Sequence, residues 1–336
     1  MNRKPSIFEW IKRELKPRSC NSEEFIYDDM ASQSDRSLPI LYQPFDAGKK
    51  SHWRDRGSLF DYLYSTGGRK LLDFGPGDGW PSLIVAPFVD QVVGVEGSRR
   101  RVEVCAENAE RLGIPNTEFL FVEPGGRLPF PDDSFDGVMA ASSVEQTSNP
   151  KATLHELFRV LRPGGRLRIG YEALGRYQNG RERETRLCQL NDHTCRFILY
   201  DRQIDDECAK QYGITLAMSR REAINSLSKD GGSVSFDTIS IPLLEKVRSA
   251  VVDARVCSLA HPSGRTLVSW LKDVGFSEVQ PSPSGGEFAG LLFDRLPERQ
   301  RPKNIDSVDT LLKPLVRIVV QMVAPLDLDP MITAIK

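Results

Sequence analysis

The chain has 336 residues, of which 40% are hydrophobic and 27% charged, and its formal net charge is −1. This composition is typical of a soluble globular protein with one large domain or two. The balanced charge, without a long basic run, disfavours nucleic acid as an obligatory partner. No segment approaches the ~18 consecutive apolar residues of a transmembrane span, and charges interrupt the N-terminus too early for a secretion signal. We therefore expect a cytoplasmic protein whose six cysteines are reduced thiols.

Residues 1–57 are predicted to form an N-terminal extension that begins with a short amphipathic helix. Phe8, Ile11 and Leu15 share one face of this helix, and basic residues lie opposite. We expect the apolar face to dock on the body of the protein. Contact with a membrane surface is the alternative for a basic amphipathic helix.

The second half of this extension is rich in proline and aromatic residues and leads into a helix predicted from about Arg56 to Ser65. Such a loop can fold over a ligand as a lid. Tyr42, His52 and Trp53 are its candidates for ligand contact. Core packing for Trp53 and a structural hydrogen bond for His52 are the competing interpretations.

From Lys70 onward, apolar strand-like runs alternate with helical stretches, a pattern that predicts a parallel sheet covered by helices on both faces. Glycine or proline follows two of the helices, as expected for helix ends. The predicted strands span residues 70–74, 91–96, 117–122, 137–142 and 165–171, and the predicted helices follow Pro81 and span 98–113 and 151–161.

This regularity stops after residue 172, which divides the chain into further segments. We take 58–172 as the core and 173–261 as a polar, irregular and partly helical insertion that contacts substrate or a second copy of the chain. The α/β pattern returns over 262–296, which would end the core. A helical tail, 297–336, is expected to pack on the body or in a homodimer, with Pro314 kinking its helix or marking its start.

The insertion contains a cluster of soft metal ligands that raises the question of a zinc site. Cys188, His193, Cys195 and Cys208 could in principle coordinate one ion. Their spacing matches no common zinc ribbon or finger, so we predict no metal.

The motif DFGPGDG, residues 73–79, lies between a predicted strand and a predicted helix, which is the context of a ligand-binding loop. Gly75 would allow a tight turn. Gly77 would let the backbone approach a ligand, and Gly79 would permit close packing of helix on strand. A purely structural turn is the alternative reading of such a loop.

Glu96 ends the next strand, 23 residues after Asp73, where an acid can accept both hydroxyl groups of a ribose. The spacing of the glycines differs from the dinucleotide pattern G-x-G-x-x-G. Asp73 at the strand end would repel a pyrophosphate and attract an ammonium group. The residues therefore favour a cationic nucleoside over a dinucleotide.

The segment from Leu71 to Ile169 resembles the class I S-adenosylmethionine-dependent methyltransferases, within them the type 11 group that acts on small molecules. The resemblance is carried by DFGPGDG, VVGVEGS, LPFPDDSFDGVMAASSVEQ and HELFRVLRPGGRLRI. It implies a Rossmann-like, seven-stranded, mostly parallel sheet whose last strand is antiparallel, with residues 262–296 as the closing helix and the last pair of strands. It also implies S-adenosylmethionine as the cofactor.

Carried over residue by residue, the resemblance predicts a cofactor site at the ends of the strands. The site residues implied are Asp73, Gly75, Gly77, Gly79, Glu96, Gly97, Ser98, Glu123, Ala141 and Ser142. Glu123 departs from the family pattern, because the usual aspartate falls on Pro124. The family's Glu-His pair after the fourth strand reads Glu145-Gln146, so a histidine base is missing at that point.

Methyl transfer from a sulfonium depends mainly on positioning, and it needs a general base only when the nucleophile arrives protonated. The candidates for substrate contact or catalysis are Glu145, Gln146, Tyr171 and His52. The leading hypothesis is an enzyme that methylates an O, N or C atom of a small organic molecule. Methylation of a protein or RNA and a non-catalytic scaffold that binds S-adenosylmethionine are the alternatives.

Overall fold

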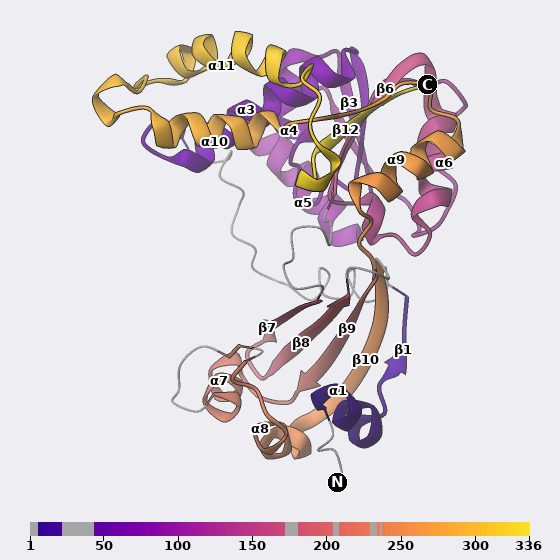
Figure 1. Ribbon diagram of the computed structural model, residues 1–336, viewed down its shortest axis with the longest axis vertical. Helices are drawn as coiled ribbons and strands as arrows, with labels where there is room; N and C mark the ends of the chain where they lie inside the picture. The colour runs from indigo at the N-terminus through magenta and orange to yellow at the C-terminus, as the bar shows by residue number, and fades with distance from the viewer. Residues whose placement is uncertain (1–5, 22–43, 172–180, 204–207, 229–233, 236) are drawn as a thin grey trace. The chain divides into compact units, whose positions relative to one another are not determined.

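The computed structural model describes residues 6–21, 44–171, 181–203, 208–228, 234–235 and 237–336 (Figure 1). The chain forms two compact units. The first comprises residues 1–36 and 177–261, and the second comprises 37–176 and 262–336. Each unit has its own sheet and its own hydrophobic core.

The second unit is built on a seven-stranded sheet, counted over the residues that the structure describes. Its strand order is β11-β12-β6-β5-β2-β3-β4. β2 to β6 are parallel, and β12 runs antiparallel to both β6 and β11. The strands are β2 (Lys70–Phe74), β3 (Gln91–Glu96), β4 (Thr117–Phe121), β5 (Phe135–Ala141), β6 (Leu161–Gly170), β11 (Val279–Ser282) and β12 (Met331–Ile335). The predicted fold class is confirmed.

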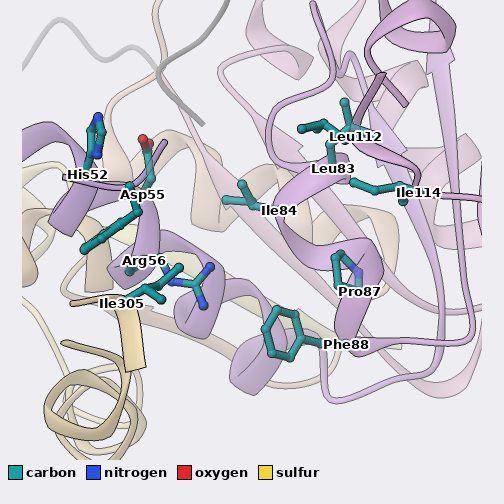
Figure 2. A pocket seen from close by; sticks show the side chains of 11 residues that line it. His52, Asp55, Arg56, Leu83, Ile84, Pro87, Phe88, Leu112, Ile114 and Ile305 are labelled. Carbon is teal, nitrogen blue, oxygen red and sulfur yellow. The ribbon is translucent and has the colours of Figure 1, made fainter. Parts of the chain in front are cut away.

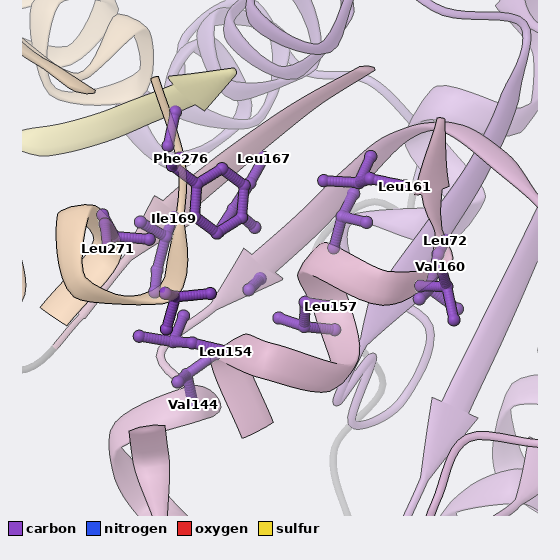
Figure 3. Packing of buried hydrophobic residues seen from close by; sticks show 14 of the residues in the cluster. Leu72, Val144, Leu154, Leu157, Val160, Leu161, Leu167, Ile169, Leu271 and Phe276 are labelled. Atoms are coloured by element: carbon purple, nitrogen blue, oxygen red, sulfur yellow. The ribbon is translucent and has the colours of Figure 1, made fainter. Parts of the chain in front are cut away.

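Two helices cover one face of this sheet (Figure 3). They are α6 (Pro150–Val160) and α9 (Gly264–Val274). Asn149 caps α6 by accepting a hydrogen bond from the Ala152 N–H, and Leu154 and Leu157 then point inward at helical spacing. Successive residues of a strand face opposite sides, so Leu72 joins this core and Leu71 joins the core on the other face.

The other face carries α3 (Lys50–Thr66), α10 (Gly285–Arg295), α11 (Ile305–Val319) and the short α4 (Ser82–Val85), which continues into η3 (Ala86–Phe88). α3 and α10 approach very closely: a Cβ on Gly57 would lie 2.4 Å from the carbonyl oxygen of Gly285. Only glycine fits at that contact. Pro314 lies inside α11, whose buried face includes Val308, Leu312 and Val316.

A buried ion pair joins this helical layer to the sheet. Arg168 on β6 donates from Nε and Nη2 to the two carboxylate oxygens of Asp61 on α3, at 2.7 and 2.9 Å. Asp61 also accepts a hydrogen bond from the backbone N–H of Gly285 at the start of α10. One carboxylate therefore connects α3, β6 and α10.

The prediction that the core ends at residue 296 was wrong, whereas the helix predicted for the tail exists as α11 and packs on the body of the unit. Residues 287–296, read as part of the returning strands, lie mostly in helix α10. The strand that closes the sheet, β12, comes from the predicted tail and pairs with β6 through Ile332 and Ile169. The remaining helices of this unit are α5 (Arg99–Leu112) and the short η4 (Val144–Gln146), η8 (Glu298–Gln300) and η9 (Leu326–Leu328).

The first unit contains an antiparallel sheet where a polar, irregular and partly helical insertion was predicted. Two α-helices do lie in this segment, but the prediction that the rest is irregular was wrong. The strand order is β1-β10-β9-β8-β7, with β1 parallel to β10. The strands are β1 (Arg18–Ser19), β7 (Arg181–Asn191), β8 (Thr194–Gln203), β9 (Cys208–Leu216) and β10 (Val251–Ala260). Its helices are α1 (Ile7–Trp10), which continues into η1 (Ile11–Leu15), α7 (Arg220–Leu227), α8 (Ile241–Val247) and η7 (Arg248–Ala250).

The N-terminal helix packs on this sheet, as the docking interpretation predicted. Phe8 and Ile11 are buried against Phe197 and Tyr212 in one core cluster. Ser6 begins the helix with a capping box that includes Glu9. The apolar face of the helix is therefore used within its own unit.

Candidate functional site

Three loops of the second unit meet at one edge of its sheet, because the carboxyl ends of neighbouring parallel strands lie together. The loops follow β2, β3 and β5, and β2 pairs with both of the others. The predicted glycine loop, Glu96 and the Ala141–Ser142 pair each follow or end one of these strands. The structure thus brings together the three main parts of the predicted site.

The glycine loop has a backbone that ordinary residues adopt rarely, since φ is +75° at Gly75, +66° at Gly77 and +109° at Gly79. A Cβ on Gly75 would lie 2.6 Å from the Cβ of Ser143, so this glycine lets the loops after β2 and β5 touch. A Cβ on Gly77 would meet no atom within 4 Å. Gly77 therefore borders open space, as expected for a residue beside a ligand.

Glu96 is held at the tip of β3 by two backbone N–H groups. Gly77 donates to its Oε2 at 3.0 Å, and Ser98 donates to its Oε1 at 3.2 Å. The side chain is only 4% exposed. Burial raises the pKa of Glu96, and the hydrogen bonds and Arg101 partly offset that shift.

Asp73 is fully buried and anchors the start of α4. Its Oδ2 accepts hydrogen bonds from the backbone N–H of Ser82 at 3.0 Å and from the Ser82 hydroxyl at 2.6 Å. Its Oδ1 is buried and has no hydrogen-bond partner among the described residues. Burial raises the pKa of Asp73 to about 7; Ser82 opposes the shift and the charge of Glu96 adds to it.

The other predicted cofactor residues occupy the same rim. Ser98 is buried and caps α5 through its hydroxyl, and Gly97 precedes it in the chain. Ala141 ends β5, and Ser142 follows it with φ +52°. Glu123 is exposed just beyond β4 and lies 3.9 Å from Arg99. Their contacts with a cofactor stay predictions.

The candidates for substrate contact are divided between two places. Glu145 and Gln146 form η4 directly after β5, and Tyr171 follows β6, so all three lie at the edge that carries the glycine loop. Glu145 and Tyr171 are buried, and Gln146 donates from Nε2 to the carbonyl oxygen of Ser142. His52 lies on α3 and lines a cavity to which neither the glycine loop nor Glu96 contributes.

Trp53 and Tyr42 are the other two residues of the predicted lid. Trp53 is a core residue whose Nε1 donates to the carbonyl oxygen of Ala47, which confirms the packing interpretation. Tyr42 lies outside the described residues.

Sequence reasoning missed three residues that hold the glycine loop in place. Ser82 binds Asp73, as described above. Asn108 on α5 donates from Nδ2 to the carbonyl oxygen of Asp78 at 3.0 Å, and the Cys105 thiol contacts the carbonyl oxygen of Gly77 at 3.4 Å. Asn108 follows Cys105 by three residues, so the two share a helix face. This spacing of a polar residue and a cysteine was the sequence signal that could have indicated contact with the loop.

Among the described residues, no three histidine, cysteine, aspartate or glutamate side chains are grouped to hold a metal ion. Cys195 packs in the main core of the first unit, and Cys188 packs in the cluster on the other face of the sheet. The side chain of Cys208 lies outside the described set. No helix in the described part of the chain is both long and apolar enough to cross a membrane.

A family described as a methyltransferase domain, of the type 11 group, matches residues 72–169. The chain contains a class I S-adenosylmethionine-dependent methyltransferase domain. The match begins in β2 and ends in β6, so it contains every predicted cofactor residue.

Relatives of the methyltransferase domain include methyltransferases named for different small molecules. The demethylmenaquinone methyltransferase of Tropheryma whipplei is 31% identical over 142 residues, which cover 42% of this chain and 55% of the relative. The 27-O-demethylrifamycin SV methyltransferase of Amycolatopsis mediterranei is 35% identical over 104 residues, which cover 31% of this chain and 38% of the relative. The chain thus spans between about two fifths and about half the length of these curated relatives.

A solved structure that covers most of the chain is that of the CcbJ methyltransferase from Streptomyces caelestis. It matches with a TM-score of 0.44 and 14% identity, over 94% of this chain and 97% of that one.

The residues at the sheet edge fit S-adenosylmethionine, the cofactor of this class. A carboxylate offers about four lone-pair sites. The hydrogen bonds from Gly77 and Ser98 occupy one site on each oxygen of Glu96, which leaves further sites for ribose hydroxyl groups. The unpartnered Oδ1 of Asp73 adds a second acid near the glycine loop. Two acids and an open Gly77 suit a cationic nucleoside.

Proposed function

We propose that this protein transfers a methyl group from S-adenosylmethionine to an O, N or C atom of a small organic molecule. The observation that carries the proposal is the arrangement at Glu96, whose buried carboxylate is fixed by Gly77 and Ser98 beside open space. The names of the demethylmenaquinone and rifamycin relatives support a small-molecule acceptor.

The chemistry of the cofactor fits the charges of the site. S-adenosylmethionine, when bound, supplies a methyl group on a positively charged sulfur. The task of the protein is then to orient the reactants and to exclude water, which can provide several kcal/mol of catalysis. Asp73 and Glu96 sit on adjacent strands and place two buried acids beside the glycine loop.

Glu145, Gln146 and Tyr171 are the residues that we assign to the acceptor side. They follow β5, which pairs with β2, and β6, which pairs with β5; both strands lie on the side of β2 away from Glu96. A general base is required only for an acceptor that is protonated at neutral pH.

Calorimetry with S-adenosylmethionine tests the cofactor site. The Glu96→Ala variant is expected to bind about 1–3 kcal/mol more weakly, because charge-assisted hydrogen bonds to the ribose are lost. Glu103→Ala is the matched control, since Glu103 is an exposed glutamate on the neighbouring helix α5. Equal affinities for the Glu96→Ala variant and the wild type would remove Glu96 from the site.

Transfer of a labelled methyl group tests the reaction itself. The full-length protein is incubated with methyl-labelled S-adenosylmethionine and a panel of phenols, amines, quinols and activated methylene compounds. Label in a small-molecule product supports the proposal. Label in added protein or RNA supports the macromolecular alternative. Tight cofactor binding without any transfer supports a non-catalytic binding protein.

A further inference from the structure

A cavity of about 260 Å³ lies between α3, the α4–η3 segment and the end of α5 (Figure 2). Its wall is mostly apolar and includes Leu83, Ile84, Phe88, Leu112 and Ile305. An engineered apolar cavity of roughly 150 Å³ binds benzene. This cavity therefore has room for a single substituted ring, and it is separate from the residues assigned to the cofactor.

One polar side chain that lines the cavity is His52, which offers a hydrogen-bond donor. His52 is 3% exposed, and its Nδ1 accepts a hydrogen bond from the backbone N–H of Asp46 at 2.7 Å. Nδ1 is therefore unprotonated, so in the neutral ring the proton is on Nε2. Burial, aided by Lys49, lowers the pKa of His52, which favours the neutral ring. Nε2 is buried and has no acceptor among the described residues.

The second polar group is an acceptor one turn further along the same helix face. Asp55 follows His52 by three residues, a spacing that places side chains next to each other on a helix. Its Oδ2 is buried, and the indole of Trp80, outside the cavity lining, lies close enough to this carboxylate to lower its pKa by hydrogen bonding. A carboxylate offers about four lone-pair sites, so acceptor sites of Asp55 remain unused. Burial raises the pKa of Asp55 to about 6, so the carboxylate is mostly ionised at pH 7. The cavity thus offers one unused donor beside one unused acceptor.

The remaining charge at the cavity is already neutralised. Arg56 donates from Nε to Asp309 at 2.7 Å, and its guanidinium lies over the rings of Phe60 and Phe88. An anionic ligand would meet Asp55, and among the residues that line the cavity Arg56, the one with a permanent positive charge, is already paired. An ammonium group would meet the Nε2–H of His52. A hydroxyl group satisfies both residues, since it accepts one hydrogen bond and donates another.

We propose that this cavity binds a neutral molecule with a single hydroxylated ring. The hydroxyl accepts a hydrogen bond from Nε2–H of His52 and donates one to Oδ2 of Asp55, and the ring packs against Ile84 and Phe88. The site belongs to the helical layer on one face of the sheet, and its lining contains none of the residues assigned to the cofactor. Leu83 and Ile84 on its wall follow Ser82, the partner of Asp73, in helix α4.

Three probes that share an ethyl-substituted ring and differ at the opposite ring position test this site on the protein without S-adenosylmethionine. They are 4-ethylphenol, 4-ethylanisole and ethylbenzene, and ligand-observed NMR titration gives their dissociation constants. The phenol is expected to bind about tenfold or more tightly than the ether, because the ether oxygen can accept from His52 but cannot donate to the charged Asp55. Equal affinity for the phenol and the ether, or no binding of the phenol, would overturn the proposal.

Two variants then locate the bound probe. Asp55→Leu should abolish the preference for the phenol. Ile305→Trp, at a 38% exposed position on the rim, should fill the cavity and remove binding of all three probes. Leu328→Trp is the control at an exposed position outside the cavity, and it should bind like the wild type. Unchanged binding to the Ile305→Trp variant would place the probe elsewhere and refute the site. Thermal melts report whether each variant is folded, and the comparison of probes on the wild type holds even if Asp55→Leu unfolds.

Discussion

Removal of one charge from the buried ion pair between Asp61 and Arg168 should strongly destabilise the methyltransferase unit. The two side chains are 1% and 0% exposed, and they share two hydrogen bonds. The Asp61→Asn substitution keeps the shape of the side chain but leaves the guanidinium buried without a counter-charge. It also turns an amide N–H₂ group toward the donors of Arg168 or of Gly285.

Breaking a buried pair in this way costs about 3–5 kcal/mol. Because Arg168 also donates to Ser282 and Thr333, some of its hydrogen bonds survive, and we expect a loss near the lower end of that range. Urea denaturation, followed by tryptophan fluorescence and far-UV circular dichroism, measures the change in the free energy of unfolding.

The Asp90→Asn substitution is the matched control for this experiment. Asp90 also makes a two-point contact with an arginine, Arg69, but both side chains are largely exposed to water. Exposed pairs contribute little, because water and salt screen them. We therefore expect no measurable loss for Asp90→Asn. If Asp61→Asn loses no more stability than this control, the reasoning about the buried pair is refuted.

Two further predictions concern the cofactor loop. Asp73 should make the affinity for S-adenosylmethionine depend on pH: with a pKa of about 7 in the free protein, it becomes protonated and neutral below that value, so affinity should be about tenfold lower at pH 6 than at pH 8 and should level off above pH 8. Calorimetry between pH 6 and 8 checks this, and Asp73→Asn should show a weaker dependence; identical profiles would contradict the role. Gly75→Ala should lower stability by about 1–3 kcal/mol, because a methyl group would press on Ser143 at an unfavourable φ. Gly77→Ala should lower the melting temperature less than Gly75→Ala does, since its methyl group meets no protein atom within 4 Å, but it should weaken cofactor binding more. A larger loss of stability for Gly77→Ala together with a larger loss of affinity for Gly75→Ala would contradict both assignments.

The sheet from β2 to β6 could be predicted from the sequence because its signals are local. Runs such as Leu71–Leu72 and Val92–Val93 are buried on both faces, and turn residues and helix caps separate them. Glu96 and the glycine loop follow directly from the same pattern, since strand ends place them.

The remainder depends on contacts between residues that are distant in the chain. The apolar run in helix α10 resembles a strand in sequence. Its first two residues, Gly285 and Gly286, are explained by the close packing of α3, which leaves no room for a Cβ at either position. In β8, Phe197 and Ile198 enter different core clusters, so the alternation typical of a half-exposed strand is absent. The segments on both sides of this strand are polar and charged, so they do not show the apolar pattern from which strands are predicted.

The candidate site shows the same division. Asp73 and Glu96 were found because acids at strand ends are conspicuous. Ser82 and Asn108 were missed because a serine after proline and an asparagine in a helix are ordinary in sequence. The cavity at His52 was also missed. Its lining comes from helices that are distant in the chain, including the short α4, so it exists only once these helices pack together.

The position of β12 has a consequence for biosynthesis. Its partner β6 ends at Gly170, yet β12 begins at Met331, so about half of the chain must be translated between the two strands. Throughout that interval β6 would present a bare edge that can recruit foreign strands. A nascent chain stalled between these points should therefore be prone to aggregation and depend on chaperones, whereas release of β12 from the ribosome would seal the edge.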